Sequence, residues 1–355
     1  MRLEIATMAV RYRMGAQVYE TEIVSRAEGA LAKVSDNWEF SHKVVRSLRS
    51  DLPGTMRLPI GMLERAGNAT RRMIGKLAYP RDAVVHRMGL SLPPSPGEIV
   101  TLHDTVAWRY PDEGSPITAA GAELRDASAV VCVSESTAAD AVELFGLTNV
   151  RVVYPGVDER FRNPMPLTPS TREGLGLRGR YVLHAGGASE RKNLAGLADA
   201  WSQLHSSFPD VSLALAGPPH PRRAELFRAL PRVVFLGRVS DALVPGLLAG
   251  ADAVVVPSLY EGFGLPVIES MAAGTPTVVA STSSLVEVAG DAAILVRTTG
   301  PEIADGIAAV LSQAIDCESL VAKGKLRAST FSWERCAQEH AAIWNDVGVS
   351  RCEKS

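Results

Sequence analysis

The sequence is poor in several features that mark particular classes of protein. Aromatic residues make up only 6% of the 355 residues, and the four cysteines form no Cys-x-x-Cys pair, so neither a disulfide framework nor a zinc site is expected. No apolar run reaches the roughly 18 to 20 residues of a membrane-spanning helix, and the first 30 residues lack the basic-then-apolar order of a signal peptide. We therefore expect a cytoplasmic protein.

Two common nucleotide-binding motifs are also missing. No Gly-x-x-x-x-Gly-Lys-Ser/Thr loop occurs. Gly174, Gly176 and Gly179 match the dinucleotide fingerprint, but they precede an apolar run, whereas the mechanism requires a strand, then the glycine turn, then a helix. The net charge of -2 argues against nucleic acid as the main partner.

What the chain does contain is an aliphatic globular composition, with 46% hydrophobic and 21% charged residues. A chain of this length exceeds the size at which one core keeps growing, so about two domains are expected. Short apolar runs alternate with helical patterns, which indicates parallel βαβ units in an α/β fold. The predicted strands are 83–86, 98–102, 129–133, 151–153, 181–184, 212–216, 233–236, 253–256 and 277–280.

The segment 154–171 is rich in proline and poor in periodic apolar residues, so it is expected to link two domains. The first domain then covers residues 1–160 and the second residues 172–330. Apolar residues near helical spacing continue over about 331–349 and predict a final helix.

Charge is unevenly distributed over the first domain. Residues 42–88 hold ten Lys or Arg against three acidic residues, and residues 89–145 hold two Arg against nine acidic residues. The basic region 42–88 is either an acceptor-binding or membrane-facing surface or an ordinary solvated surface. Within it, residues 62–78 have the pattern of an amphipathic helix, which fits burial against the domain's own sheet or contact with a membrane. The apolar face consists of Met62, Leu63, Ala66, Ala69, Met73, Ile74 and Leu77, with Arg65, Arg71, Arg72 and Lys76 away from it.

Three loops follow predicted strands at the sheet edge where open α/β sheets bind ligands. The first is AGGASERKN, residues 185–193, in which glycines allow close backbone approach and Arg191 and Lys192 supply positive charge at a helix start. Free N–H groups and the helix dipole both favour an anion there.

The second loop is YEGFGLPVIESMAAG, residues 260–274, with Glu261 and Glu269 on either side of a glycine turn. Gly262 and Gly264 permit tight backbone geometry, and Pro266 suits a first helical turn. Backbone amides are therefore expected to face a diphosphate or a sugar hydroxyl. Since a carboxylate does not bind phosphate, the two glutamates are expected to accept hydrogen bonds from hydroxyl groups.

The third loop is TLHDTVAWRY, residues 101–110, with His103 and Asp104 where a strand ends. His103 is either a ligand contact or a structural histidine. Gly15, ahead of a predicted helix in RMGAQVYE, is a further candidate for close approach to phosphate.

A family resemblance is carried by AGGASERKN, by FLGRVSD and by PSLYEGFGLPVIESMAAGTPTVVAS, above all by the Glu-x7-Glu pair. These stretches are similar to the retaining GT-B glycosyltransferases of family 4, especially mannosyl- and rhamnosyltransferase-like bacterial members. The resemblance is strong over residues 181–296, recognisable over 82–157 and thin over 1–80. It implies two Rossmann-like parallel-sheet domains facing across a cleft, with the acceptor bound by the first, the nucleotide sugar by the second, and the C-terminal helix crossing back to the first.

The resemblance also implies roles for individual residues. Arg191 and Lys192 would neutralise the donor diphosphate, Glu261 would hold sugar hydroxyls, and His103 would lie beside the donor sugar, so these four form the expected catalytic set. The expected donor-binding set is Gly15, Gly187, Asn193, Arg238, Val239, Gly262, Phe263, Gly264, Leu265 and Glu269. Glu269 would hold the nucleotide ribose, and the Arg238–Val239 backbone would meet the base.

The function implied is retaining transfer of a hexose, with mannose preferred, from a GDP-, UDP- or dTDP-linked donor. The acceptor would be a hydroxyl of a saccharide, a lipid-linked sugar or a small molecule, with peripheral contact at the inner membrane face as an option. No metal or other cofactor is expected, and no Asp-x-Asp triplet occurs. A nucleotide-sugar epimerase, a sugar phosphorylase or a non-catalytic nucleotide-sugar-binding subunit are the alternatives.

Overall fold

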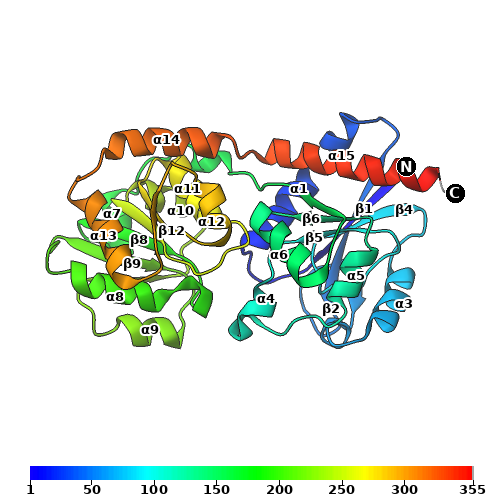
Figure 1. Ribbon diagram of the computed structural model, residues 1–355, viewed down its shortest axis with the longest axis horizontal. Coiled ribbons are helices and arrows are strands. Elements are labelled where there is room, and N and C mark those ends of the chain that lie inside the picture. The colour runs from blue at the N-terminus through cyan, green and yellow to red at the C-terminus, as the bar shows by residue number, and fades with distance from the viewer. Residues whose placement is uncertain (354–355) are drawn as a thin grey trace. The chain divides into compact units, whose positions relative to one another are not determined.

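The computed structural model describes residues 1–353. The chain forms two compact units, one of Met1–Gly156 with the C-terminal segment from Ser332, and one of Val157–Phe331. Each unit is a parallel β-sheet with helices on both faces (Figure 1). This arrangement confirms the predicted α/β class with two Rossmann-like parallel-sheet domains.

The first unit is built on a seven-stranded parallel sheet in the order β3-β2-β1-β4-β5-β6-β7. Strands β4 to β7 coincide with four of the predicted strands. The bounds are β1 Arg2–Met8, β2 Glu39–Ser47, β3 Met56–Leu58, β4 Ala83–Arg87, β5 Ile99–Leu102, β6 Ala129–Cys132 and β7 Val150–Val152.

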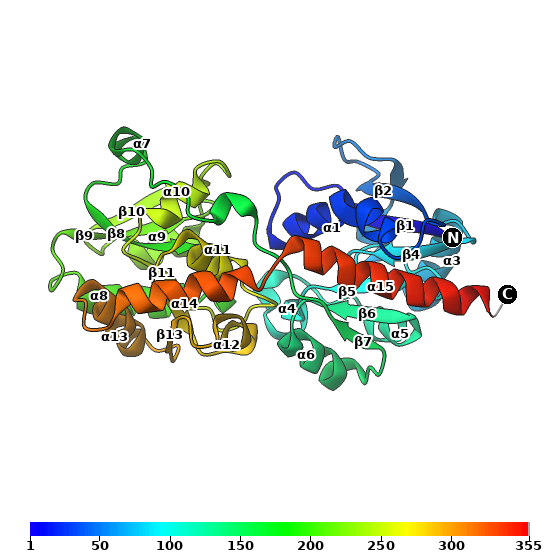
Figure 2. The ribbon, with the colours of Figure 1, turned by 90° about the horizontal axis from the view of Figure 1, so that it is seen from above.

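The helices of the first unit lie on both faces of this sheet, with α15 running beside α1 in both views (Figures 1 and 2). Since α15 belongs to the first unit, the C-terminal helix returns to that domain as the resemblance implied. The bounds are α1 Gly15–Ala32, α2 Ile60–Leu63, α3 Asn68–Ala78, α4 Val106–Arg109, η1 Pro111–Glu113, α5 Ala120–Asp126, α6 Glu135–Phe145 and α15 Trp333–Cys352.

Strands β1 and β2 were not predicted, because charged residues interrupt their apolar patterns. β1 is nevertheless buried over its central residues, including Glu4. Lys43 Nζ of β2 forms an ion pair with Glu4 Oε1 at 2.7 Å, so the charge inside the sheet is paired. A carboxylate in a buried strand is tolerated when it has such a partner.

An ion network lies between α3, β4 and α5 in the core of the first unit. Arg87 donates to Glu98 at 2.7 Å and to Glu123 at 2.9 Å, and Arg71 also pairs with Glu123. All four side chains are at most 1% exposed. The network joins the basic region 42–88 to the acidic region 89–145, so part of the charge contrast along the sequence is internal pairing rather than a surface.

The predicted amphipathic helix over 62–78 differs from the structure in three respects. The segment forms two helices, α2 and α3, with a break between them at 64–67. Arg71, expected on the polar face, is fully buried because Leu63 O and Leu92 O accept its guanidinium N–H groups at 2.9 and 2.7 Å. Met73 and Leu77, expected to be covered if the helix packs on its sheet, are 57% and 77% exposed.

Helix α15 is held to the first unit by buried polar contacts between aromatic rings. Tyr19 Oη and His340 Nε2 lie 2.5 Å apart, and Trp344 Nε1 donates to His86 Nδ1 at 3.0 Å. The ring of Tyr19 also meets His103 edge-on, with 5.2 Å between centroids. The C-terminal helix is thereby connected to a residue expected at the active site.

The second unit is built on a six-stranded parallel sheet in the order β10-β9-β8-β11-β12-β13. Five of its strands were predicted, and only β13 was not. The bounds are β8 Arg180–Ala185, β9 Val211–Ala216, β10 Val233–Gly237, β11 Ala253–Val256, β12 Thr277–Ala280 and β13 Ile294–Val296.

In Figure 1, helices α8, α9 and α13 lie on one face of this sheet and α10, α11, α12 and α14 on the other. The core between α8, α13 and the sheet is aliphatic, with Trp201 fully buried in it. The bounds are α7 Pro169–Gly174, η3 Glu190–Lys192, α8 Leu194–Leu204, α9 Pro221–Phe227, α10 Val244–Ala249, α11 Leu265–Ala273, α12 Ser283–Ala289, α13 Gly300–Leu311 and α14 Cys317–Ser329. No helix within residues 1–353 is both long and apolar enough to cross a membrane.

The segment expected to be a free linker is largely part of the second unit. From Val157 onward it packs there and forms the short helix η2, Glu159–Phe161, before α7. Phe161 is 2% exposed, and Arg160 Nη1 donates to Asp241 O at 3.0 Å. One buried aromatic anchor therefore gives this proline-rich stretch a fixed place.

Candidate functional site

The strand order of the second unit places two of the predicted loops side by side. Strands β8 and β11 are parallel, hydrogen-bonded neighbours. On one side of this pair the later strands β9 and β10 follow β8, and on the other side β12 and β13 follow β11, so the order of strands along the sheet changes direction here. The loops that leave their carboxyl ends, 186–193 and 257–264, therefore flank the switch point where open α/β sheets bind ligands.

Glu261 joins these two loops through a buried set of ion pairs. Lys192 Nζ donates to Oε1 at 2.6 Å, and Arg191 Nη1 donates to Oε2 at 2.7 Å. Ser258 Oγ also donates to Oε1 at 2.7 Å. Three of the residues expected to be catalytic are thus in direct contact.

The electrostatic balance keeps the Glu261 carboxylate ionised. Burial acts to raise the pKa of Glu261, but Lys192 and Arg191 outweigh it and lower the pKa to about 2. Each carboxylate oxygen can accept two hydrogen bonds, and a lysine ammonium has three donors. Because Glu261 takes one donor from Lys192, the ammonium keeps donors for a second anion at the same place.

The glycine turn after Glu261 forms the start of α11. Gly264 has φ +107° and precedes the first helical residue, Leu265. A Cβ at Gly264 would lie 2.8 Å from Leu285, so the position requires glycine both for its backbone angle and for space. Ser284 Oγ donates to the carbonyls of Glu261 and Phe263 at 2.8 and 2.9 Å, which fixes the turn. The amide end of α11 is therefore shaped before any ligand arrives.

The other predicted residues of the first loop serve the loop itself. Asn193 has φ +51°, accepts from Gly196 N at 3.2 Å and donates to Thr298 O at 2.8 Å. Its side chain caps α8 and ties three segments together. Gly187 lies beside Arg223, whose guanidinium donates to the Gly187 carbonyl at 2.9 Å.

Glu269, on α11, is in a different environment from Glu261. It is partly buried, and burial raises its pKa to about 7 while Arg160 lowers it and Asp158 and Asp241 raise it. Helix η2, which carries Arg160, packs against α11. The segment that was expected to be a linker thus contributes to the pKa of this carboxyl, after the larger effect of burial.

Arg238 and Val239 follow β10, beside the loop after β9. Gly217 N donates to Gly237 O at 2.8 Å, so the two loops are joined. Arg238 is exposed and Val239 is partly buried. Their backbone lies at the same edge of the sheet as the loops around Glu261.

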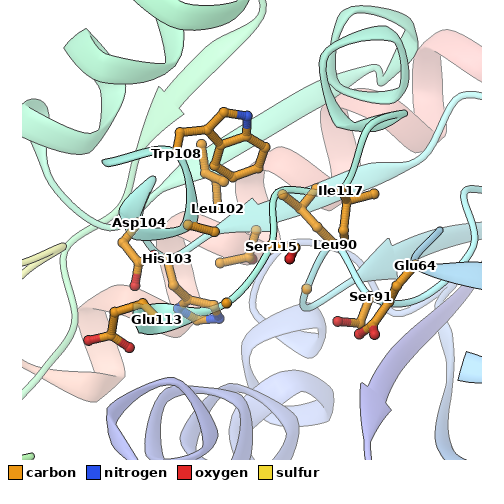
Figure 3. Close-up of a pocket in the computed structure, with 14 residues that line it drawn as sticks. Glu64, Leu90, Ser91, Leu102, His103, Asp104, Trp108, Glu113, Ser115 and Ile117 are labelled. Atoms are coloured by element: carbon orange, nitrogen blue, oxygen red, sulfur yellow. The ribbon is translucent and has the colours of Figure 1, made fainter. Parts of the chain in front are cut away.

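The predicted residues of the first unit, Gly15 and His103, lie at the carboxyl ends of β1 and β5. Gly15 is the first residue of α1. His103 lines a cavity with Asp104 and Trp108 (Figure 3). The ring nitrogen Nε2 of His103 lies 3.1 Å from Met88 O, which can only accept, so Nε2 carries the proton and Nδ1 is the acceptor. Burial lowers the pKa of His103 to about 4, so the ring is neutral at physiological pH.

The polar residues of the site that were not predicted include Ser258 and Arg223. Ser258 lies two residues after the end of β11, a position at the carboxyl end of a strand that could have singled it out. Arg223 is 2% exposed and joins the loops after β8 and β9 by donating to Gly186 O at 2.6 Å and Pro218 O at 2.9 Å. Its position on α9 gave no signal in the sequence. Within residues 1–353, no three His, Cys, Asp or Glu side chains are grouped so as to hold a metal ion.

Family models match both units of the chain. A model described as "Glycosyltransferase Family 4" matches residues 32–161, and one described as "Glycosyl transferases group 1" matches residues 179–313. The matched regions include the cavity around His103 and the whole site around Glu261.

Individual proteins with known descriptions are similar over the same regions. The O-antigen chain mannosyltransferase B of Escherichia coli is 32% identical over 235 residues, which cover 61% of this chain and 60% of that protein. A GDP-mannose-dependent alpha-(1-6)-phosphatidylinositol dimannoside mannosyltransferase of Mycobacterium tuberculosis is 33% identical over 230 residues, covering 63% and 59%. The chain thus spans about three fifths of the length of these relatives.

Similarity of fold extends over nearly the whole chain. The crystal structure of HepE from Anabaena, in complex with UDP-glucose, has a TM-score of 0.72 at 19% identity and covers 98% of this chain and all of its own. Two parallel-sheet units, the Glu-x7-Glu loop at the switch point of the second, and the two family matches lead to one conclusion. The chain belongs to glycosyltransferase family 4 and has the GT-B fold.

Proposed function

We propose that this protein transfers a hexose from a nucleotide-sugar donor to a hydroxyl group of a saccharide, lipid-linked or small-molecule acceptor, with retention of anomeric configuration. The observation that carries the proposal is the contact of Arg191, Lys192 and Glu261 beside the amide end of α11. Cations, amides and a carboxylate in one place match a donor that presents a diphosphate next to sugar hydroxyls.

In this proposal, each group of the site meets one part of the donor. Lys192 and Arg191, together with the free N–H groups at the start of α11, take the diphosphate, since helix amino termini favour anions. Glu261, whose pKa is about 2, accepts hydrogen bonds from the sugar. Glu269 accepts from the nucleotide ribose, and the backbone at Arg238 and Val239 meets the base.

The chemistry follows from where charge develops. When the glycosidic bond breaks, the leaving diphosphate gains negative charge, and preorganised donors aimed at it lower the barrier by roughly 3 to 4 kcal/mol each, by analogy with an oxyanion hole. We propose front-face transfer in which the leaving phosphate takes the acceptor proton and no covalent enzyme intermediate forms. The cations of the site replace a metal ion in this scheme.

Mannose is the hexose that we propose, with GDP-mannose as donor. The support is that both relatives described above are mannosyltransferases by name, and one is described as GDP-mannose-dependent. HepE, whose structure was solved with UDP-glucose, supports a UDP-sugar as the competing donor.

We also propose peripheral contact with a membrane through α3. Met73 and Leu77 are one turn apart on this helix and strongly exposed, with the exposed Lys76 beside them. Exposed apolar side chains next to a basic residue are typical of helices that lie on an anionic lipid surface. A lipid-linked acceptor would then be reached at the membrane.

The test is to incubate the purified protein with GDP-mannose, UDP-glucose or dTDP-glucose, with and without metal chelator, and to follow release of nucleoside diphosphate and formation of glycoside by NMR. We expect turnover with GDP-mannose that chelator does not reduce. We also expect the anomeric coupling constant to show that the sugar has the same anomeric configuration in the product as in the donor. An inverted product would exclude the retaining mechanism. Interconversion of the sugar without transfer, or a requirement for inorganic phosphate, would identify an epimerase or a phosphorylase instead.

A further inference from the structure

The segment that follows β12, residues 282–284, supplies three hydroxyl groups to the loop that carries Glu261. Thr282 Oγ1 donates to the Ser258 carbonyl at 2.8 Å, and Ser284 Oγ donates to the Glu261 carbonyl at 2.8 Å. Ser283 Oγ has the opposite role, because it accepts from the backbone amide of Glu261 at 2.9 Å. The backbone of Glu261 is therefore held at its carbonyl and at its amide by two neighbouring serines.

Ser283 makes this hydrogen bond from an unfavourable backbone conformation. Its φ is +42°, in the left-handed region, where the Cβ of an L-residue crowds the following carbonyl oxygen. Glycine adopts this conformation without that cost, but it would leave the Glu261 amide without the hydroxyl. Strained residues of this kind persist where the surrounding structure fixes them, and they are concentrated at functional sites. The strain at Ser283 thus indicates that its hydroxyl has a use at this place.

The two serines restrict different parts of the backbone around Glu261. Ser284 Oγ donates to the carbonyls of Glu261 and Phe263 at 2.8 and 2.9 Å, so it fixes peptide planes that come after the Glu261 Cα. Ser283 holds the amide of the peptide plane directly before that Cα. The bond to Ser283 therefore limits rotation about φ of Glu261, and with it the direction in which the glutamate side chain leaves the backbone.

The direction of the Glu261 side chain matters because its carboxylate bridges two cations. Lys192 Nζ lies 2.6 Å from one carboxylate oxygen, and Arg191 Nη1 lies 2.7 Å from the other. A small rotation of the carboxylate would lengthen at least one of these contacts. In the proposed reaction the same carboxylate accepts hydrogen bonds from the donor sugar, where a displacement of about 1 Å can reduce the rate roughly 100-fold.

We propose that Ser283 is a positioning residue for the reaction. Its hydroxyl fixes the amide of Glu261 and so holds the Glu261 carboxylate where it meets both cations and, during transfer, the donor sugar. Ser283 acts through Glu261 and does not itself touch the reacting groups. The catalytic part of this inference rests on the proposed function, whereas the part that concerns the ion pairs of Glu261 does not.

Three substitutions separate the hydroxyl from the backbone strain. Ser283→Gly removes both, so the unfolding midpoint should stay near that of the wild type or rise, while kcat for release of GDP from GDP-mannose should fall at least about tenfold. Ser283→Ala removes only the hydroxyl and should lose both stability and kcat. Ser283→Thr keeps the hydroxyl but adds a branch on the strained backbone, so its midpoint should fall while kcat stays within about threefold. Turnover that instead follows the midpoint, with Ser283→Gly active and Ser283→Thr inactive, would overturn the proposal.

Binding of GDP adds a measurement that a purely structural role would not separate from turnover. GDP lacks the sugar that Glu261 is expected to hold, so its Kd, measured by calorimetry, should stay within about threefold in Ser283→Gly although kcat falls. Gln313→Gly is the control, because Gln313 is an exposed residue after α13 with φ +55° and lies outside the site. Its midpoint should match or exceed that of the wild type, and its kcat should not change. A loss of kcat as large as that of Ser283→Gly would overturn the assignment.

Crystal structures of the wild type and of Ser283→Gly, both without donor, test the ion pairs apart from turnover. We expect at least one of the two N···O contacts of Glu261 with Lys192 and Arg191 to lengthen beyond about 4 Å in the variant. If it does while the wild type turns over no nucleotide sugar, the proposed function fails and the positioning of Glu261 stands. If the wild type is active and both contacts keep their lengths in Ser283→Gly, the inference about Ser283 fails alone.

Discussion

Lys192 Nζ lies 2.6 Å from Glu261 Oε1 although 69 residues separate them in sequence. The same carboxylate also accepts from Arg191 and Ser258. The arrangement holds two cations at the switch point of a parallel sheet while their charge is partly balanced. In the proposed reaction, a donor diphosphate would meet cations that are already positioned, so its binding would need little rearrangement of the protein.

Replacing Lys192 with Ala separates catalysis from stability. Because Glu261 keeps Arg191 and Ser258 as partners, we expect the unfolding midpoint to change little. Loss of one preorganised donor is expected to reduce kcat by roughly 100- to 1,000-fold. Steady-state kinetics with GDP-mannose and thermal unfolding measure the two effects. Lys323→Ala is the control, since Lys323 forms an exposed ion pair with Asp291 in the same unit and its loss should leave kcat unchanged. Near-normal turnover of Lys192→Ala would show that Lys192 has no part in the mechanism.

Donor affinity should depend on the protonation of Glu269. Burial raises its pKa to about 7, and only the ionised carboxylate accepts from both ribose hydroxyls. Raising the pH from 6 to 8 increases the ionised fraction from roughly one tenth to nine tenths, so the Kd for GDP should fall by about ninefold. Calorimetry at both pH values measures this change.

The matched variant for that experiment is Glu269→Gln, which should bind weakly and with little dependence on pH. Glu225→Gln, at an exposed position on α9, should behave like the wild type. A wild-type Kd that is the same at pH 6 and pH 8 would contradict the role given to Glu269.

The fold was predictable wherever a strand has a continuous run of apolar residues in the sequence. All nine predicted strands are present, because strands such as 253–256 are buried on both faces and need no polar residue. β1 escaped prediction because Glu4 interrupts its pattern, and the pairing with Lys43 that makes Glu4 tolerable is a tertiary contact. Arg71 was predicted to lie on a polar face because its partner, Glu123, is distant in the sequence and the local pattern does not indicate it.

The site was predictable in its position more than in its contacts. Strand-end loops with glycines and charges identified Arg191, Lys192 and Glu261 from spacing and chemistry. The sequence could not indicate that these three side chains bind one another, nor that Arg160 of the supposed linker influences Glu269. Helix α4, which lines the cavity beside His103, is held by the pair of Arg109 with Asp140, a contact between residues 31 positions apart that the sequence did not indicate.

The buried ion network of the first unit predicts a large stability effect at one residue. Glu123 is the partner of both Arg71 and Arg87, so Glu123→Gln leaves two buried cations short of a counter-charge. We expect a loss of about 3 to 5 kcal/mol in the free energy of unfolding. Asp126→Asn, which removes only a surface pair with Arg72, should cost less than about 1 kcal/mol. Urea unfolding followed by tryptophan fluorescence compares them, and similar costs for the two variants would refute the prediction.

Membrane contact through α3 can be tested by sedimentation with vesicles that contain anionic lipid. Adding charge at the exposed positions in the double variant Met73→Glu/Leu77→Glu should weaken binding at least tenfold, since burial of one such side chain contributes about 1.5 to 3 kcal/mol. Leu326→Glu, at a 71% exposed position on α14, is the control. Turnover with a water-soluble acceptor should be equal in all three proteins. If the double variant still sediments like the wild type, α3 is not the contact.

The attachment of α15 should make the first unit sensitive to acid. Burial lowers the pKa of His340 to about 3, whereas in the unfolded chain a histidine titrates near pH 6.5. Below pH 6.5 the unfolded state therefore binds a proton that the folded state does not, and stability falls as the pH falls. Between pH 7.5 and 5.5 this one residue should cost about 1.4 kcal/mol.

His340→Gln isolates that contribution, because a glutamine amide can still meet Tyr19 Oη but does not titrate. Four of the five tryptophans, Trp38, Trp108, Trp333 and Trp344, belong to the first unit, so fluorescence reports mainly its unfolding. Glu20, whose pKa burial raises to about 8, changes stability in the opposite sense, but equally in both proteins.

The drop in stability between pH 7.5 and 5.5 should be about 1.4 kcal/mol smaller in the His340→Gln variant than in the wild type. His205→Gln, in the second unit, should match the wild type. An equal drop in His340→Gln would mean that His340 is protonated alike in the folded and unfolded states, and that the contact with Tyr19 does not depend on its neutral ring.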